Sequence, residues 1–188
     1  NVERKVISQW SFKIEDYASE LLSDLDLLDG WPEQVKTMQK NWIGQSDGME
    51  FTFGVGESSF IEVFTTRPDT IMGVTFIALS FNHPITREYA KNDEDLQSWL
   101  KNNSKGSTSE ISSKLTEKNG YKLKLEAIHP ISKEQIEVWV SNYVLSYGFG
   151  ALMGVPAHDQ RDYDFAKKYK IKIKQVIENK NSTVDITK

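Results

Sequence analysis

Residues 49–64 read Met-Glu-Phe-Thr-Phe-Gly-Val-Gly-Glu-Ser-Ser-Phe-Ile-Glu-Val-Phe. Apolar and polar side chains alternate along 49–55, which is typical of a strand with one buried face. Residues 56–59 are turn formers, and residues 60–64 read as a returning strand. This stretch therefore predicts a β-hairpin at the start of a sheet.

Further strands and helices follow the hairpin. Mostly apolar runs of strand length lie at 74–79, 136–145, 151–155 and 171–177, and helices are expected at 84–92, 95–102, 110–118 and 163–169. Strands separated by long helical insertions do not read as a regular series of β-α-β units, so a Rossmann fold is not expected. The pattern predicts an α+β fold with a mixed, largely antiparallel, barrel-like sheet and inserted helices.

A helical arm precedes the hairpin. Apolar residues repeat at helical spacing from about 15 to 28, and a second short helix starts after Pro32 and reaches Trp42. Gly44 and Gly48 then interrupt the helical pattern. We therefore expect two parts, with residues 1–43 as a connecting arm and residues 44–188 as the main domain.

The composition narrows the classes of function. The chain has 188 residues, no cysteine and a net charge of −4, which is the wrong sign for a protein that holds nucleic acid mainly through phosphates. The lysines from 167 to 174 are read as a solvated strand edge. The lack of cysteine fits a cytoplasmic protein, and no apolar run reaches the roughly 20 residues of a membrane span. The chain begins with Asn1 rather than Met and reads as a piece of something longer.

The segment 65–70, Thr-Thr-Arg-Pro-Asp-Thr, carries more polar chemistry than packing requires. Pro68 fixes its own φ angle and holds Arg67 extended, so the segment is stiff. Three hydroxyls and a carboxylate on a rigid edge can form a polar wall with defined hydrogen-bond positions. An ordinary turn, with Asp69 or Thr70 capping a helix, explains the same residues without a function.

A second unusual segment, 150–162, runs from a strand of small and apolar residues through Pro156 into a helix. Asp159 is a credible N-cap, and Asp162 follows in the first turn. Capping alone explains both carboxylates. Alternatively, Arg161 pairs with one of them and leaves the other for a substrate ammonium group, with Gly154 making room for the substrate.

A metal site is an alternative use of the second segment. His158, Asp159 and Asp162 are eligible ligands, but their spacing matches none of the strong zinc signatures. The sequence also lacks the Gly-x-Ser-x-Gly motif of serine hydrolases. A hydrolase built on these residues would therefore use water as the nucleophile.

Together the two segments resemble the paired signatures of the editing domain of bacterial or organellar leucyl-tRNA synthetases, the insert called connective polypeptide 1. The first continues in the same way through residues 73–76 and His83-Pro84, and the second through Tyr163 and Phe165-Ala166. Residues 136–145 resemble the strand before the second signature, and residues 9–44 resemble the arm that joins the insert to the synthetase body. The resemblance covers nearly the whole chain.

The resemblance implies hydrolysis of the 3′ ester of tRNA(Leu) that carries isoleucine, norvaline, methionine or valine, by positioned water and without a metal. Asp162 would bind the α-ammonium group of the amino acid, Thr70 would exclude leucine sterically, and Thr65 and Thr66 would hold the substrate or the water. Other roles are implied for Met153, Val155 and Tyr147, which would line the pocket of the terminal adenosine, and for Arg67, Asp69, Asp159, Arg161 and His158, which would support these residues.

The implied partners are the 3′ end of tRNA(Leu) and the rest of the synthetase, and the chain itself is expected to be a monomer. ATP and Mg²⁺ would belong to the synthetic domain outside this chain. Phe149 stands where the family usually has Thr, and Leu123-Lys124 stands where a Thr-Gly pair is expected. The chain also ends at Lys188, before the last strands of the family's domain. These departures leave open a catalytically weak module that only docks a tRNA end.

Overall fold

The computed structural model describes residues 8–56, 58–103, 117–146 and 148–178. The chain divides into two compact units, Asn1–Asp47 and Gly48–Lys188. The proposed joining of the first unit to a synthetase body stays a prediction.

The first unit is helical. It contains the 3-10 helices η1 (Ile14–Tyr17) and η2 (Asp24–Leu27) and the α-helices α1 (Ala18–Ser23) and α2 (Glu33–Ile43). The helix predicted at 15–28 is therefore split into α and 3-10 turns, whereas the predicted second helix is present and ends at Gly44, whose φ of 66° suits a C-terminal glycine. Among the described residues of this unit, only Leu25 is buried.

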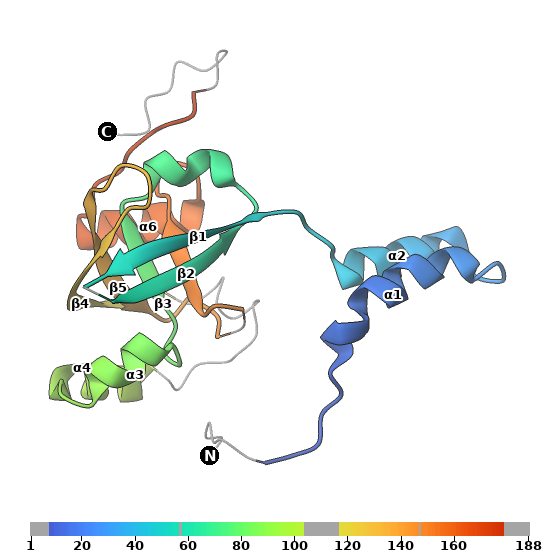
Figure 1. Cartoon of the computed structure of the whole chain (residues 1–188), viewed down its shortest axis with the longest axis horizontal. Coiled ribbons are helices and arrows are strands. Elements are labelled where there is room, and N and C mark those ends of the chain that lie inside the picture. Colours follow the sequence, from blue (N-terminus) through green and yellow to red (C-terminus); the bar gives the residue numbers. More distant parts are fainter. Residues whose placement is uncertain (1–7, 57, 104–116, 147, 179–188) are drawn as a thin grey trace. The chain divides into compact units, whose positions relative to one another are not determined.

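The second unit is an α+β fold, as predicted (Figure 1). Its strands are β1 (Met49–Val55), β2 (Ser59–Thr65), β3 (Phe76–Leu79), β4 (Gly120–Ile128), β5 (Gln135–Ser141) and β6 (Ala151–Gly154). Its helices are η3 (Pro68–Gly73), α3 (Pro84–Ala90), α4 (Glu94–Asn103) and α6 (Gln160–Tyr169). Figure 1 shows α3 and α4 side by side at one end of this unit.

The six strands form one sheet in the order β2-β1-β4-β5-β3-β6. All neighbouring pairs are antiparallel except β3 and β5. The outermost strands β2 and β6 also contact each other, although no ladder of hydrogen bonds joins them in the described part of the chain. The sheet is therefore curled so that its two edge strands meet, but over the described residues it is not closed into a hydrogen-bonded barrel.

Two apolar clusters lie on opposite faces of β3. Ile77 and Leu79 belong to the larger cluster inside the curled sheet, whereas Phe76 and Ala78 belong to a smaller cluster with Phe165 of α6. Successive side chains of a strand point to opposite faces, so the uniform burial of β3 places α6 on the outer face of the sheet. This packing sets the position of the first turn of α6.

Three predictions about strands need correction. Residues 171–177 form no strand, because the segment leaves the sheet and the Val176 N–H donates to His158 instead of to a neighbouring strand. The strand predicted at 136–145 ends at Ser141, where the next backbone N–H, that of Asn142, donates to the carbonyl of Asn119. The strand β4 was not predicted. The helix predicted at 110–118 falls mostly outside the described residues.

Candidate functional site

The two segments singled out in the sequence converge on one pocket of about 460 Å³ in the second unit. The first segment leaves β2 and continues through η3 into β3, and the second leaves β6 and enters α6. Because β3 and β6 pair antiparallel, with Phe76 opposite Gly154, η3 and the start of α6 meet at the same edge of the sheet. The pocket is lined by Phe64, Thr65, Thr66, Arg67, Thr70, Leu152, Met153, Val155, His158, Asp159, Arg161 and Asp162.

The threonine segment is fixed by its own hydrogen bonds. The Arg67 N–H donates to Thr65 Oγ1 at 3.0 Å, and the Thr70 hydroxyl donates to the Arg67 carbonyl at 2.8 Å. The Arg67 guanidinium holds Asp69 through two bonds of 3.1 and 3.0 Å and lowers the pKa of that carboxyl. Thr70 is only 1% exposed, so it forms a rigid part of the wall. Asp69 supports the segment without lining the pocket.

His129 anchors η3 to the sheet. Its Nδ1 accepts hydrogen bonds from the N–H groups of Ile131 and Ser132, both at 3.1 Å. Nε2 therefore carries the proton and donates to the carbonyl of Ile71 at 2.9 Å. This role was not predicted, because His129 stands alone before Pro130 and its partner Ile71 is distant in the sequence.

Asp159 and Arg161 form a pair at the start of α6, as expected. Asp159 caps the helix by accepting from the N–H groups of Arg161 at 2.8 Å and Asp162 at 3.2 Å. The Arg161 guanidinium also contacts both oxygens of this carboxylate, at 3.3 and 3.2 Å. Burial alone would raise the pKa of Asp159, but the bonds and charge of Arg161 outweigh it, so the pKa is lowered.

Asp162 is left as the second carboxylate, and it is 5% exposed. Its Oδ1 accepts from the Tyr143 hydroxyl at 3.0 Å, and its Oδ2 accepts from the Val155 N–H at 2.9 Å. Burial raises the pKa of Asp162 to about 7, and the Val155 bond offsets part of this increase. Within the described residues, no salt bridge includes Asp162. The pocket therefore contains a buried carboxylate without a cationic partner, which changes its charge near neutral pH.

The role of Tyr143 is not predicted by the sequence. Tyr143 falls within the strand predicted at 136–145 but lies beyond the end of β5, and its spacing does not indicate a contact with Asp162. Tyr143 itself does not line the pocket; it contacts Asp162 from behind.

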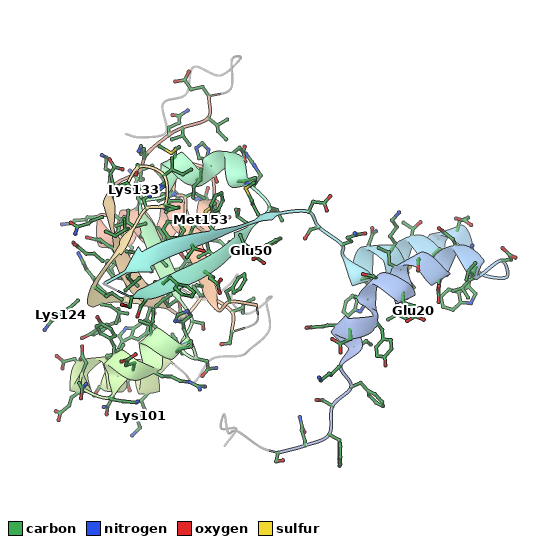
Figure 2. All side chains as sticks on the ribbon, in the orientation of Figure 1. Glu20, Glu50, Lys101, Lys124, Lys133 and Met153 are labelled. Atoms are coloured by element: carbon green, nitrogen blue, oxygen red, sulfur yellow. The ribbon has the colours of Figure 1, made fainter. Side chains whose placement is uncertain are left out.

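Packing explains Gly154 without a substrate. A Cβ atom at this position would lie 2.2 Å from the ring of Phe76, so the close packing of β6 on β3 already requires glycine. The remaining predicted pocket residues Met153 and Val155 line the cavity with largely buried apolar side chains, and Met153 is labelled among the strands in Figure 2. Tyr147 lies outside the described residues.

The metal interpretation of the second segment gains no support from the geometry. The imidazole Nε2 of His158 accepts from the Val176 N–H at 3.3 Å, and Asp159 is paired with Arg161. Across the part of the chain that the structure describes, no group of three or more His, Cys, Asp or Glu residues could hold a metal ion. In the same part of the chain, no helix has the length and apolar character needed to cross a membrane.

The two departures noted in the sequence fall in different environments. Leu123 is 2% exposed and belongs to the core on the inner face of β4, so an apolar residue there serves packing. Lys124 is exposed on the outer face of the same strand (Figure 2). Phe149 is partly exposed before Gly150, and it is not among the residues that line the pocket.

A comparison with known protein families finds a match that includes both pocket segments. Residues 40–188 match the family model described as leucyl-tRNA synthetase, editing domain. The chain belongs to the leucyl-tRNA synthetase editing-domain family. This confirms the predicted family, which is a family of aminoacyl-tRNA deacylases.

Relatives of this editing domain are parts of much longer proteins. The chain is 54% identical over 180 residues to a leucine--tRNA ligase of Marinomonas sp. (strain MWYL1), covering 95% of the chain and 22% of the relative. It is 52% identical over 185 residues to a leucine--tRNA ligase of Vesicomyosocius okutanii, covering 98% and 23%. The editing domain thus spans less than a quarter of the length of these relatives.

A solved structure shares the fold of the editing domain. It is a LeuRS of Agrobacterium radiobacter K84 in a ternary complex with tRNA and LeuAMS. The similarity has a TM-score of 0.76 at 34% sequence identity, and it covers 93% of this chain and 21% of that chain. The α+β fold is thus the fold of the corresponding part of a leucyl-tRNA synthetase.

Proposed function

We propose that this domain hydrolyses the ester bond of tRNA(Leu) that carries a wrong amino acid, with isoleucine, norvaline, methionine or valine as the substrate class. The observation that carries the proposal is that Thr65, Thr66, Thr70 and the buried carboxylate of Asp162 all line one cavity of about 460 Å³. Family membership and the similarity to a LeuRS solved with tRNA support the same assignment.

Asp162 is suited to bind the α-ammonium group of the aminoacyl ester. Arg161 is occupied by Asp159, so the carboxylate of Asp162 is the unpaired negative charge of the pocket among the described residues. An ammonium group would compensate a charge that burial disfavours, and charge-assisted hydrogen bonds of this kind are strong. The free α-amino group distinguishes an aminoacyl ester from other esters.

Thr70 is suited to reject leucine. Its hydroxyl is held on the Arg67 carbonyl, so the side chain cannot turn away from a bulky substrate. A synthetic site distinguishes near-isosteric amino acids by only about 1–3 kcal/mol, so a second site must sort them by a different shape criterion. A fixed wall that meets the branched end of leucine provides such a criterion.

Thr65 and Thr66 are suited to orient the reacting groups. The Thr65 oxygen already accepts the Arg67 N–H, and its own proton remains available to donate to the ester or to water. Thr66 is exposed and lines the same pocket. Water held by these hydroxyls would attack the carbonyl carbon, and the leaving oxygen of the ribose would take a proton, helped by the neighbouring ribose hydroxyl.

The terminal adenosine would lie against the apolar part of the pocket, at Met153 and Val155, with Tyr147 as a further contact. No metal or other cofactor is required in this scheme, because water is positioned by hydroxyl groups and charge is supplied by Asp162. ATP and Mg²⁺ would serve the synthetic domain. The partners are the 3′ end of tRNA(Leu) and the remainder of the synthetase.

The test is hydrolysis of isoleucyl-tRNA(Leu) and leucyl-tRNA(Leu) by the chain, its Asp162→Asn variant and its Asp164→Asn variant, with and without a chelator. Asp164 is a matched control, because it is an exposed carboxylate in the same helix and contacts Gln160. We expect hydrolysis of the isoleucyl ester alone and no effect of the chelator. The loss should be at least about tenfold for Asp162→Asn only, since bonds to charged groups contribute about 1.5–3 kcal/mol.

Other outcomes would redirect the assignment. A chelator that abolishes hydrolysis would favour a metal-dependent hydrolase instead. Binding of a tRNA end without hydrolysis at high enzyme concentration would reduce the domain to a docking module.

A further inference from the structure

The buried hydroxyl of Tyr143 has no assigned role in the scheme above. Tyr143 is 6% exposed, and its ring packs edge-to-face on Phe165 with ring centroids 5.5 Å apart. Its hydroxyl lies 3.0 Å from Asp162 Oδ1. The ring of Tyr143 is thus fixed by packing, and its hydroxyl contacts the carboxylate of Asp162, which lines the pocket.

Two donors from different parts of the sheet hold this carboxylate. Tyr143 follows β5 and binds Oδ1, whereas the Val155 N–H follows β6 and binds Oδ2. One bond on each oxygen fixes the plane of the carboxylate and leaves the remaining lone pairs for a ligand. The Val155 N–H belongs to the backbone, so Tyr143 supplies the one side-chain donor of the pair.

The charge of Asp162 depends on few neighbours. The pKa of Asp162 is raised to about 7 by burial and by the neighbouring Asp159, although the Val155 N–H, the Tyr143 hydroxyl and Arg161 lower it. Asp159 caps α6 and is paired with Arg161 in its first turn, whereas Tyr143 and Val155 contact Asp162 from the ends of β5 and β6. Donors to the ionised form favour that form, so loss of the Tyr143 hydroxyl should favour the protonated acid.

We propose that Tyr143 is a positioning residue, which aims the Asp162 carboxylate into the pocket and keeps it available for the ammonium group of the substrate. This inference rests on the proposed function for its substrate, although the effect on Asp162 can be measured without one. Tyr143 does not touch the reacting atoms; it acts through Asp162.

The first experiment compares Tyr143→Phe with Tyr169→Phe. Tyr169 is a matched control, because its ring also packs on Phe165 and its hydroxyl accepts a hydrogen bond from the Gly120 N–H at 2.8 Å, away from Asp162. The titration of Asp162 is followed by NMR of ¹³C-labelled aspartate carboxyl groups, with Asp162→Asn used to assign the signal. We expect Tyr143→Phe to move the Asp162 midpoint upward by about one pH unit, and Tyr169→Phe to leave it in place.

The second readout is the pH profile of isoleucyl-tRNA(Leu) hydrolysis. With Tyr143→Phe, kcat/KM should fall about tenfold below neutral pH and recover toward the wild-type value as Asp162 ionises at higher pH. A loss of the same size at every pH, matched by Tyr169→Phe, would reduce Tyr143 to a packing residue and overturn the proposal. An unchanged Asp162 midpoint in a folded Tyr143→Phe variant would overturn it as well.

A third variant covers the case in which Tyr143→Phe does not fold. Replacement of Tyr143 by 3-fluorotyrosine keeps the ring and makes the hydroxyl a stronger donor, so the Asp162 midpoint should move downward. A midpoint that stays in place would contradict the proposal. If the wild-type chain hydrolyses no ester, the proposed function fails, whereas the NMR titration still decides whether Tyr143 controls the charge of Asp162.

Discussion

At the scale of single residues, Thr70 is held in one position by the bond from its hydroxyl to the Arg67 carbonyl. Thr70 is 1% exposed, and truncation to alanine removes its methyl group and its hydroxyl from the wall of the pocket. We expect Thr70→Ala to start hydrolysing leucyl-tRNA(Leu) while it keeps its activity on the isoleucyl ester. One methylene in an apolar pocket changes discrimination about 10–200-fold, and deacylation assays with both esters should show a change of that order.

The control for this prediction is Thr70→Val, which keeps the volume and replaces the hydroxyl by a methyl group. It should still reject the leucyl ester, whereas Thr70→Tyr should close the pocket to every ester. Leucyl-tRNA(Leu) hydrolysis by Thr70→Val equal to that by Thr70→Ala would show that the hydroxyl, rather than the bulk, excludes leucine.

Asp162 should make stability depend on pH. Its pKa is raised from 3.8 to about 7 in the folded chain, so between these values the folded state binds more protons than the unfolded state. Its contribution to stability is therefore fully present below pH 3.8 and is lost as pH rises through about 7. Asp162→Asn removes this titration but can keep both bonds, because the amide oxygen accepts from Val155 and the amide nitrogen donates to Tyr143.

The measurement is urea unfolding of both proteins at pH 5 and pH 8. The stability of wild type relative to Asp162→Asn should decrease toward pH 8, by about 1.4 kcal/mol for each unit of pKa difference that is lost. Other titrating groups cancel in this comparison. Parallel curves would mean that the carboxylate is not shifted.

The sequence predicted part of this site for definite physical reasons. The Asp159–Arg161 pair could be predicted because it depends only on neighbouring residues. Asp159 caps the helix, and Arg161 lies two positions further on in its first turn. The contacts of Tyr143 with Asp162 and of His129 with Ile71 span 19 and 58 positions, and they depend on the sheet order. Such long-range contacts carry no local signal, so they could not be predicted from spacing.

At the scale of elements, β4 and the segment 171–177 show what alternation can predict. Residues 122–126 alternate between charged and apolar side chains, and so do residues 171–174. Only β4 lies between two strands, β1 and β5, that complete its ladder. The segment 171–177 instead passes His158 and Gly73. Alternation thus identifies two-faced segments, whereas a strand also requires a partner edge, and that depends on the whole fold.

The tight contact between β3 and β6 gives a prediction for Gly154. Alanine there would place its Cβ 2.2 Å from the fully buried ring of Phe76. We expect Gly154→Ala to lower the free energy of unfolding by about 1–3 kcal/mol, as for other overpacked cores. Urea unfolding measures this loss.

Gly54→Ala is the matched control, because a Cβ on this strand residue would meet Ile128 at an ordinary 3.8 Å. Its effect should stay below about 1 kcal/mol. If both variants lost the same stability, general strand propensity rather than the Phe76 contact would explain the effect.

At the scale of the whole molecule, the two units differ in how they are stabilised. Both apolar clusters lie within the second unit, whereas the described part of the first unit buries only Leu25. We therefore expect residues 44–188 alone to unfold cooperatively, with a melting temperature within a few degrees of the whole chain. Thermal unfolding followed by circular dichroism checks this, and a broad transition without a midpoint would contradict it.

The distribution of tryptophan gives the chain two optical signals. Three of the five indoles are in the first unit, where Trp10 is 101%, Trp42 87% and Trp31 43% exposed, so their emission should be red-shifted and readily quenched by iodide. Trp139 is 6% exposed and packs on Phe165 and Tyr169 of α6, the helix that carries Asp162. Trp99, the fifth indole, is half-buried against Phe81 and Tyr121. The blue-shifted light that iodide reaches least therefore comes from Trp99 and Trp139, and the Trp139 component would report events at α6 without any added dye.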